Sequence, residues 1–440
     1  METKSPESVT LIAQLLNKDN FTHFGIQELV SMLKLWEVDP LKALGSELAS
    51  NGISPTDLAH VKEDRFAGFP FLRLEVTREE TKRIAASSNR MVCIARVGEL
   101  LCEGSSEAAF EAEVAAPGPR LREEAAKDED FGFVVLAHGR TISKEEQTAK
   151  IEALRFCDFH GRCSLESPDR VFILAENFKG GELWHKYLLL DLHAVMKRKT
   201  LANKFNLRER IFLGPTSTDA ELALLMTNQA RVDRGHFVLD PFFGTGSTLV
   251  PAAFFGAKCF GFEIDFRVVH GYAVGRVNPQ SPFAASIEPG KRVNCFSNYE
   301  QYGLERPEVL RCDSATFELG IGKMFDSIVC APPYGKRASA RQSKKGEAKP
   351  ADLEERKQDL PPKIIGSHIT SCEEVTEKLV RLARNALKVS GRLVFLYPGG
   401  RDADLSDKFG KFEDFELVGV SENPISKEFS RYLVTLERKK

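Results

Sequence analysis

A loop with two glycines follows a short apolar run that ends in an acid. Residues 237–239 lead into Asp240, and Gly244 and Gly246 follow before the apolar segment 248–255. This order predicts a strand, a tight loop and the start of a helix. Glycine lacks a Cβ atom, so both glycines let the backbone turn sharply and approach a ligand closely. Open α/β sheets bind nucleotides at such loops, at the carboxyl end of a parallel strand.

The loop lacks the spacing of two common phosphate-binding motifs. It has no third glycine, which the dinucleotide fingerprint requires, and no lysine follows Gly246 as in a P-loop. Ser247 and Pro251 favour a helix start, as an N-cap and as a first-turn proline. The acid at the strand end suits a ligand with little or no anionic charge, such as S-adenosylmethionine. A structural turn without a ligand is the alternative at this stage.

Two later apolar runs also end in acids. Segment 259–265 contains Glu263 and Asp265, and segment 309–313 ends in Asp313. An acid about twenty positions past a glycine loop is placed to bind both ribose hydroxyls of a nucleoside. Glu263 fits this role, whereas a helix cap fits Asp265 better.

The chain as a whole reads as an ordinary soluble globular protein of two or three domains. Its 440 residues carry a net charge of −2, so any nucleic-acid-binding surface must be local. Cys157, His160 and Cys163 lie close together, but their spacing is not a usual zinc pattern, so we expect no metal site. The nine cysteines indicate reduced thiols in a cytosolic or nuclear protein. No secretory signal or membrane-spanning run is visible.

The first half of the chain predicts α+β units. Alternating or apolar runs predict strands at 9–16, 69–76, 90–97, 131–137, 154–159 and 171–176, and helical spacing predicts helices at 26–35, 78–86 and after Ser143. Residues 112–130, with Pro117-Gly-Pro119, read as a mobile loop or linker. Such units serve as RNA-binding appendages or simply as packing domains, and these residues leave both open.

The second half predicts a doubly wound, mostly parallel sheet with an antiparallel edge. Expected strands lie at 237–240, 259–265, 309–313, 325–330 and 392–397, followed by a hairpin at 415–421 and 431–437. Expected helices lie at 222–229, capped by Thr218 or Asp219, and at 375–387, with Gly391 as a stop signal.

The sequence resembles the Rossmann-like amino-methyltransferases in Asp240-Pro-Phe-x-Gly-Thr-Gly246, in the acidic strand end at Glu263 and Asp265, and in x-Pro-Pro-Tyr-Gly at 331–335. It is more closely similar, over nearly its whole length, to the catalytic subunits of eukaryotic tRNA (guanine-10-N2) methyltransferases. Segments 139–140, 151–156, 214–220, 264–271 and 301–304 carry that similarity.

The resemblance implies a ferredoxin-like region at 1–110, a THUMP-like RNA-binding region at 111–200 and a Rossmann-like methyltransferase domain at 201–440. It also implies S-adenosylmethionine as cofactor and tRNA as substrate. A small zinc-binding activator subunit would complete a heterodimer in the cytoplasm, away from membranes.

The resemblance also implies roles for single residues. The amino-acid part of the cofactor would lie beside the glycine loop, the ribose on Glu263 and the adenine amine on Asp313. The carbonyls of Ala331 and Pro332 can accept hydrogen bonds from the guanine amine, and Tyr334 can stack on a flipped base unless it is a core aromatic. The expected cofactor-binding residues are Asp240, Phe242, Gly244, Gly246, Glu263, Asp265 and Asp313; the expected catalytic residues are Ala331, Pro332, Pro333, Tyr334 and Asp219.

One position departs from the family pattern. Family members have Asp before Pro-Pro-Tyr, and related enzymes Asn or Ser, whereas this chain has Ala331. Loss of a carboxylate acceptor would cost about 2–4 kcal/mol of transition-state stabilisation. Asp219 is the candidate substitute, although a plain helix cap is its simpler role. Ala331 keeps open a non-catalytic RNA-binding paralogue, and the Pro-Pro-Tyr motif keeps open a DNA adenine methyltransferase.

A basic stretch follows the motif. Residues 336–363 hold nine lysines and arginines against five acids, a net charge of +4. This composition suits phosphate contacts with tRNA, and a solvated disordered loop is the alternative. The residues expected to contact RNA are Lys336, Arg337, Arg341, Lys344 and Lys345.

Overall fold

The computed structural model describes residues 8–16, 24–61, 65–193, 201–214, 217–271, 275–288, 290–314, 322–333, 341–343, 367–369 and 371–440. The chain forms two compact units. Unit 1 takes the described residues of Met1–Lys18, Leu33–Asp57 and Val61–Thr200. Unit 2 takes those of Asp19–Met32, Leu58–His60 and Leu201–Lys440.

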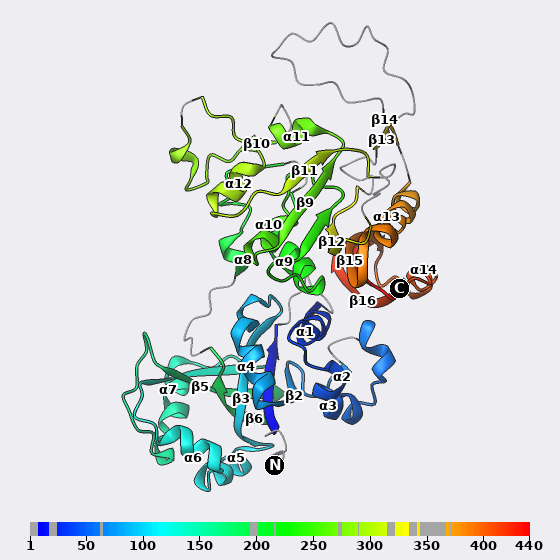
Figure 1. The fold of residues 1–440 in the computed structure, drawn as a ribbon. Helices are drawn as coiled ribbons and strands as arrows, with labels where there is room; N and C mark the ends of the chain where they lie inside the picture. Colours follow the sequence, from blue (N-terminus) through cyan, green and yellow to red (C-terminus); the bar gives the residue numbers. More distant parts are fainter. Residues whose placement is uncertain are drawn as a thin grey trace, which may run out of the picture. The chain divides into compact units, whose positions relative to one another are not determined.

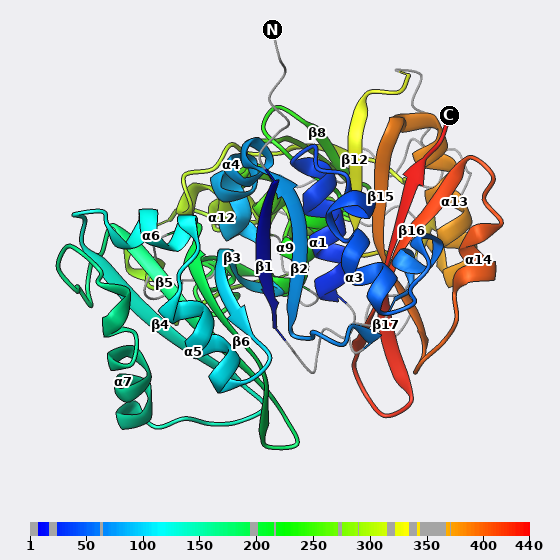
Figure 2. The same ribbon diagram turned by 90° about the horizontal axis from the view of Figure 1, so that it is seen from below.

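Unit 1 is built on one six-stranded sheet in the order β2-β1-β3-β6-β5-β4 (Figure 2). Only β4 and β5 pair in parallel; the other neighbours are antiparallel. The sheet runs through both predicted N-terminal regions, and their boundary at residue 110 stays a prediction. The strands are β1 (Ser8–Leu15), β2 (Phe71–Thr77), β3 (Ile94–Gly104), β4 (Phe131–His138), β5 (Arg170–Lys179) and β6 (Glu182–Asp191); the helices are α2 (Pro40–Ala43), α3 (Gly45–Ser50), α4 (Arg78–Ser87), α5 (Glu107–Ala115), α6 (Pro119–Ala125) and α7 (Lys144–Glu152).

Two predictions for unit 1 are wrong. The expected linker at 112–130 holds the end of α5 and all of α6, because Pro119 is the first residue of α6, where a missing N–H costs nothing. The buried carboxylate of Glu124 is paired with Arg120 and Lys127, which fixes α6 in place. The expected strand at 154–159 is instead a 3-10 helix at Arg155–Cys157 followed by a loop.

Unit 2 holds a seven-stranded sheet in the order β11-β9-β8-β12-β15-β17-β16. Figure 1 labels β9, β11, β12, β15 and β16 of this sheet. The first five strands are parallel, and β17 is antiparallel to both of its neighbours. This confirms the predicted doubly wound sheet with an antiparallel edge. The sheet strands are β8 (Phe237–Asp240), β9 (Lys258–Glu263), β11 (Glu308–Arg311), β12 (Phe325–Cys330), β15 (Leu387–Gly400), β16 (Phe415–Pro424) and β17 (Phe429–Arg438); β7 (Phe212–Leu213) pairs with β10 (Arg276–Val277), and β13 (Arg341–Ser343) with β14 (Ser367–Ile369).

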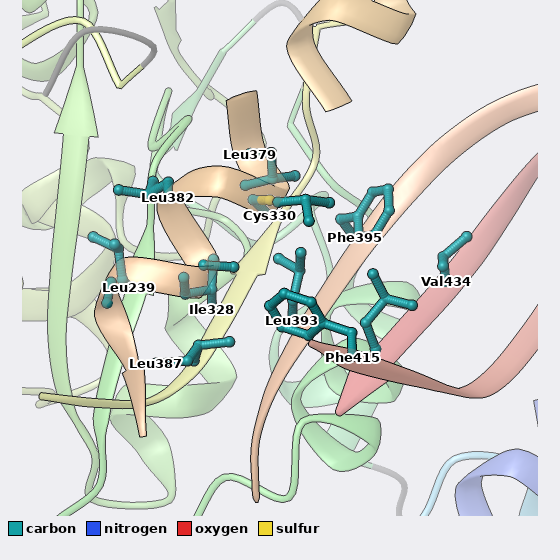
Figure 3. Close-up of a cluster of buried hydrophobic side chains, with 14 of the residues drawn as sticks. Leu239, Ile328, Cys330, Leu379, Leu382, Leu387, Leu393, Phe395, Phe415 and Val434 are labelled. Atoms are coloured by element: carbon teal, nitrogen blue, oxygen red, sulfur yellow. The ribbon is translucent and has the colours of Figure 1, made fainter. Parts of the chain in front are cut away.

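Strand alternation divides the core of unit 2 between two faces. Leu393 and Phe395 of β15 point toward α13, where they join Ile328 and Leu379 in one apolar cluster (Figure 3). Truncating a buried leucine such as Leu379 to alanine would cost about 2–5 kcal/mol. Gly391, predicted to stop this helix, lies inside β15 instead. The helices of unit 2 are α1 (Phe24–Leu35), α8 (Leu201–Lys204), α9 (Ala220–Gln229), α10 (Leu249–Phe254), α11 (Phe266–His270), α12 (Phe296–Gln301), α13 (Cys372–Ala386) and α14 (Ser406–Gly410).

Most of α1 belongs to unit 2, although it lies 200 residues from α9 in the sequence. The Asn228 amide of α9 donates to the buried carboxylate of Glu28 over 2.7 Å. The Arg392 guanidinium of β15, 1% exposed, donates to Ser31 over 2.8 Å and pairs with Glu437 at 3.0 Å. A buried charge is tolerated only when it is paired and hydrogen-bonded, so α1 completes this face of the sheet.

Candidate cofactor and active site

Asp240 ends β8 and holds the loop that follows. Its carboxylate accepts the Phe242 N–H at 2.8 Å and a hydrogen bond from the Thr248 hydroxyl. The side chain is 1% exposed, and this burial raises the pKa of Asp240 to about 7 despite the two hydrogen bonds. The residue at the N-cap position of α10 is Thr248, so the predicted Ser247 cap is wrong.

Gly244 and Gly246 both have positive φ, +52° and +72°. A Cβ atom on Gly246 would lie 2.6 Å from the Phe243 ring and 2.8 Å from the Tyr299 hydroxyl, so only glycine fits there. Around Gly244 the nearest atom to such a Cβ is 3.9 Å away. The loop is therefore packed at Gly246 and open at Gly244, where a ligand can approach the backbone.

Glu263 ends β9 and ties the loop to the neighbouring strand. One carboxylate oxygen accepts the Gly244 N–H at 2.8 Å, and the other accepts the Asp265 N–H at 2.7 Å. Burial raises the pKa of Glu263, and these hydrogen bonds partly offset that effect. The remaining acceptor capacity of both oxygens suits the hydroxyl pair of a ribose.

The other predicted acids lie at the same edge of the sheet. Asp265 is the N-cap of α11 and pairs with Arg267 at 2.7 Å, which is the capping role that the sequence favoured. Asp313 follows the end of β11, and Phe242 is half-buried against the apolar cluster of unit 2. These carboxyl ends belong to neighbouring parallel strands, so the acids lie along one edge.

Several contacts in and around the loop had no signal in the sequence. The Tyr299 hydroxyl of α12 donates to the Gly246 carbonyl at 2.8 Å. The Asn298 amide of the same helix accepts the Phe212 N–H and donates to the Phe212 carbonyl, each at 3.0 Å. The hydroxyls of Ser217 and Thr245 lie 3.1 Å apart, which joins the segment before α9 to the loop. Asp219 caps α9, as predicted, accepting the Glu221 and Leu222 N–H groups.

The proline motif starts directly after β12. Ala331 and Pro333 are half-buried and Pro332 is buried. Since β12 is next to β8, the motif follows the strand beside the glycine loop. Tyr334, Lys336, Arg337, Lys344 and Lys345 lie outside the described residues, and of Arg341 only the backbone, in β13, is described.

Two features are absent from the described part of the chain. Among those residues, no group of three His, Cys, Asp or Glu side chains is arranged to hold a metal ion. Every helix there is too short or too polar to span a bilayer.

Residues 208–390 match the family described as RMKL-like, methyltransferase domain. The tRNA (guanine(10)-N(2))-methyltransferase of Mus musculus is 28% identical to this chain, covering 86% of it and 81% of the mouse protein. The Xenopus laevis enzyme is 29% identical to this chain, over 86% of this chain and 78% of its own length. The Saccharomyces cerevisiae enzyme is 27% identical, over 67% of this chain and 68% of its own length. The match to the crystal structure of TrmN from Thermus thermophilus covers 98% of this chain and 99% of the TrmN chain, at 16% sequence identity and a TM-score of 0.40.

Proposed function

We propose that this chain transfers a methyl group from S-adenosylmethionine to the N2 amine of guanosine 10 in tRNA. The proposal follows from its similarity to the tRNA (guanine(10)-N(2))-methyltransferases. Unit 2 has the Rossmann-like methyltransferase fold over the matched residues. The observation that carries the proposal is the hydrogen bond from Gly244 to Glu263, which joins an open glycine loop to a half-buried acid placed to accept the hydroxyls of a ribose.

The site fits this cofactor. The room around Gly244 admits a ligand against the loop backbone, and the buried carboxylate of Asp240 with the half-buried one of Glu263 suits a cofactor with cationic sulfonium and ammonium groups. We assign the amino-acid part to the loop of Asp240, Phe242, Gly244 and Gly246. The ribose goes to Glu263, with Asp265 beside it, and the adenine amine to Asp313. When bound, S-adenosylmethionine supplies the sulfonium methyl.

The residues after β12 would orient the acceptor. The guanine amine is a poor nucleophile because its lone pair is delocalised into the ring. Fixed carbonyls of Ala331 and Pro332, held by the prolines, would accept its hydrogen bonds and align it for attack. No strong base is required, since the product cation can lose its proton after transfer. Tyr334 would stack on the flipped base.

The basic segment 336–363 would hold tRNA phosphates. We expect neutralising Lys344 and Lys345 to weaken tRNA binding and to flatten its salt dependence, because each phosphate contact releases counterions. An unchanged slope of binding against salt concentration would reject this role. The predicted THUMP-like region at 111–200 would add further RNA contacts.

The zinc-binding activator would pair with the outer edge of β11. Among the described strands, β11 pairs with β9 alone, and Leu310 on it is 53% exposed. An edge strand with one free side and an exposed apolar residue is suited to accept a strand from a partner. Replacing Leu310 by aspartate should reduce copurification of the activator. We place the heterodimer in the cytoplasm, where the free thiols of all nine cysteines would stay reduced.

One assay separates the alternatives. The purified chain, with and without the activator, is incubated with labelled cofactor and three acceptors: a tRNA transcript, the same tRNA with adenosine at position 10, and duplex DNA. We expect label only in the first. Label in DNA alone would indicate the adenine methyltransferase. Cofactor and tRNA binding without any transfer would indicate the non-catalytic paralogue that Ala331 suggests.

A further inference from the structure

Three polar side chains meet at the carboxyl edge of unit 2, one strand beyond the proline motif. Helix α13 connects the parallel strands β12 and β15, so its first turn, with Glu373, lies at the edge where both strands end. Cys330 pairs with Phe395 in register. Continuing both strands by two residues brings Pro332 level with Tyr397.

Tyr397 holds the two charged members of this cluster. Its hydroxyl lies 3.3 Å from the Glu373 carboxylate and accepts a hydrogen bond from the Lys408 ammonium of α14. The ammonium lies 3.4 Å from the carboxylate and 4.5 Å from the centre of the tyrosine ring. Tyr397 is 4% exposed, whereas the side chains of Glu373 and Lys408 are 64% and 35% exposed. A buried phenol therefore fixes an acceptor and a donor that both reach solvent.

The ion pair between Glu373 and Lys408 adds little to stability by itself. Exposed ion pairs contribute only about 0–1 kcal/mol to folding. The same helix carries a second such pair, Glu377 with Lys411 at 3.7 Å, without a buried tyrosine between them. The first pair differs in its anchor and in its place at the edge beside Ala331–Pro333.

The pair matches one base. The Watson–Crick edge of guanine offers two donors, N1–H and the N2 amine, next to the acceptor O6, whereas adenine offers one donor and one acceptor in the reverse order. A carboxylate beside an ammonium complements the guanine pattern.

We propose that Glu373 and Lys408 read the Watson–Crick edge of the target guanine, with Tyr397 as the positioning residue. This inference rests on the proposed function. Glu373 accepts from N1–H and from one N–H of the N2 amine, whose second N–H is left for the backbone carbonyls after β12, and it supplies the carboxylate that is absent at Ala331; Lys408 donates to O6. The amine nitrogen bonds to the methyl carbon while the carbon–sulfur bond breaks, and the electron pair stays on sulfur. The amine then loses one proton to Glu373, which passes it to solvent.

The first test compares two acceptors with the full chain and its activator. One tRNA carries guanosine at position 10; the other carries 2-aminopurine, which keeps the amine but lacks O6 and N1–H. We expect Glu373→Gln and Lys408→Met to lower the preference for guanosine, as a ratio of kcat/KM values, by roughly 5- to 150-fold. The matched controls Glu377→Gln and Lys411→Met should keep the wild-type ratio. An unchanged ratio in the first two variants, or an equal change in the controls, would overturn the proposal.

The second test asks whether Glu373 replaces the missing acid. Adding Ala331→Asp to Glu373→Gln should raise the kcat of the single variant at least tenfold. Separately, Tyr397→Phe should lower the guanosine preference without altering cofactor affinity. Cofactor affinity by calorimetry shows that each variant is folded. If the wild-type chain does not methylate guanosine, the proposed function fails. If it does, and Ala331→Asp rescues nothing, only the assignment of Glu373 fails.

Discussion

Glu263 joins the glycine loop to the end of its own strand, β9. It accepts two backbone N–H groups, from Gly244 and Asp265, so its loss both removes the proposed ribose contact and frees the loop. We expect Glu263→Ala to abolish measurable binding of S-adenosylmethionine in calorimetry. The control is Glu305→Ala, an exposed carboxylate paired with Lys258 at the other end of β9. Equal affinity in Glu263→Ala and wild type would reject the assignment.

Asp240 should make cofactor binding depend on pH. Burial raises the pKa of Asp240 to about 7, and the nearby carboxyl of Glu263 adds to the shift. A cationic cofactor binds the ionised carboxylate better, so binding requires loss of this proton below pH 7. We expect affinity to fall about five- to sixfold from pH 7 to pH 6, as the ionised fraction of Asp240 falls. Calorimetry on Asp240→Asn should show a weaker but flatter profile; an equally steep profile would exclude Asp240 as the titrating group.

Residues close together in the sequence were the predictable part of the site. The loop glycines and the acids that follow each strand lie in short motifs whose backbone demands are local. Tyr299 was missed because its contact joins positions 53 residues apart. Only the folded sheet brings α12 beside the loop, and a tyrosine in a short helix carries no mark of such a role.

At the scale of elements, α12 holds the cofactor loop through a hydrogen bond to its backbone. Since the Tyr299 hydroxyl binds the Gly246 carbonyl at 2.8 Å in a fully buried place, Tyr299→Phe leaves that carbonyl without its donor. We expect a loss of about 1–3 kcal/mol in the free energy of unfolding, with weaker cofactor binding. Tyr302→Phe, just past the same helix, serves as the control. Wild-type cofactor affinity in Tyr299→Phe would show that α12 does not position the loop.

Elements with a clear apolar pattern were predicted well, whereas the roles of Pro119 and Gly391 were predicted wrongly. The continuous apolar run of β15 and the apolar stripe of α13 predicted both elements from sequence, because β15 is buried on both faces and α13 on one. Pro117-Gly-Pro119 predicts a linker, yet Pro119 begins α6. A proline breaks a helix only in its interior, and the sequence does not show which side of the boundary it occupies.

At the scale of the molecule, the methyltransferase unit is not one continuous stretch. Residues Asp19–Met32 and Leu58–His60 belong to it together with Leu201–Lys440. We expect a fragment of residues 201–440 to be less stable than the same unit in the full chain. Removing α1 exposes the apolar surface that it covers, which should lower the free energy of unfolding by about 3–6 kcal/mol.

Thermal unfolding measures this difference. Adding a peptide of residues 19–60 to the fragment should raise its melting temperature, whereas a peptide with Glu28→Ala and Ser31→Ala should raise it less. An equal melting temperature with and without the peptide would contradict the role of α1. The sequence predicted the helix itself, but its partners Asn228 and Arg392 are polar residues with no local signal of a distant contact.

The position of α1 also constrains how the protein is made. Glu28 and Ser31 leave the ribosome 200 and 361 residues ahead of the side chains that bind them. At synthesis rates of about 5–20 residues per second, α1 waits roughly 20–70 seconds for Arg392. During that time the sheet of unit 1 can form, while the apolar face of α1 needs shielding by the ribosome surface or a chaperone. A helix translated early is thus buried only when the final strands of the chain emerge.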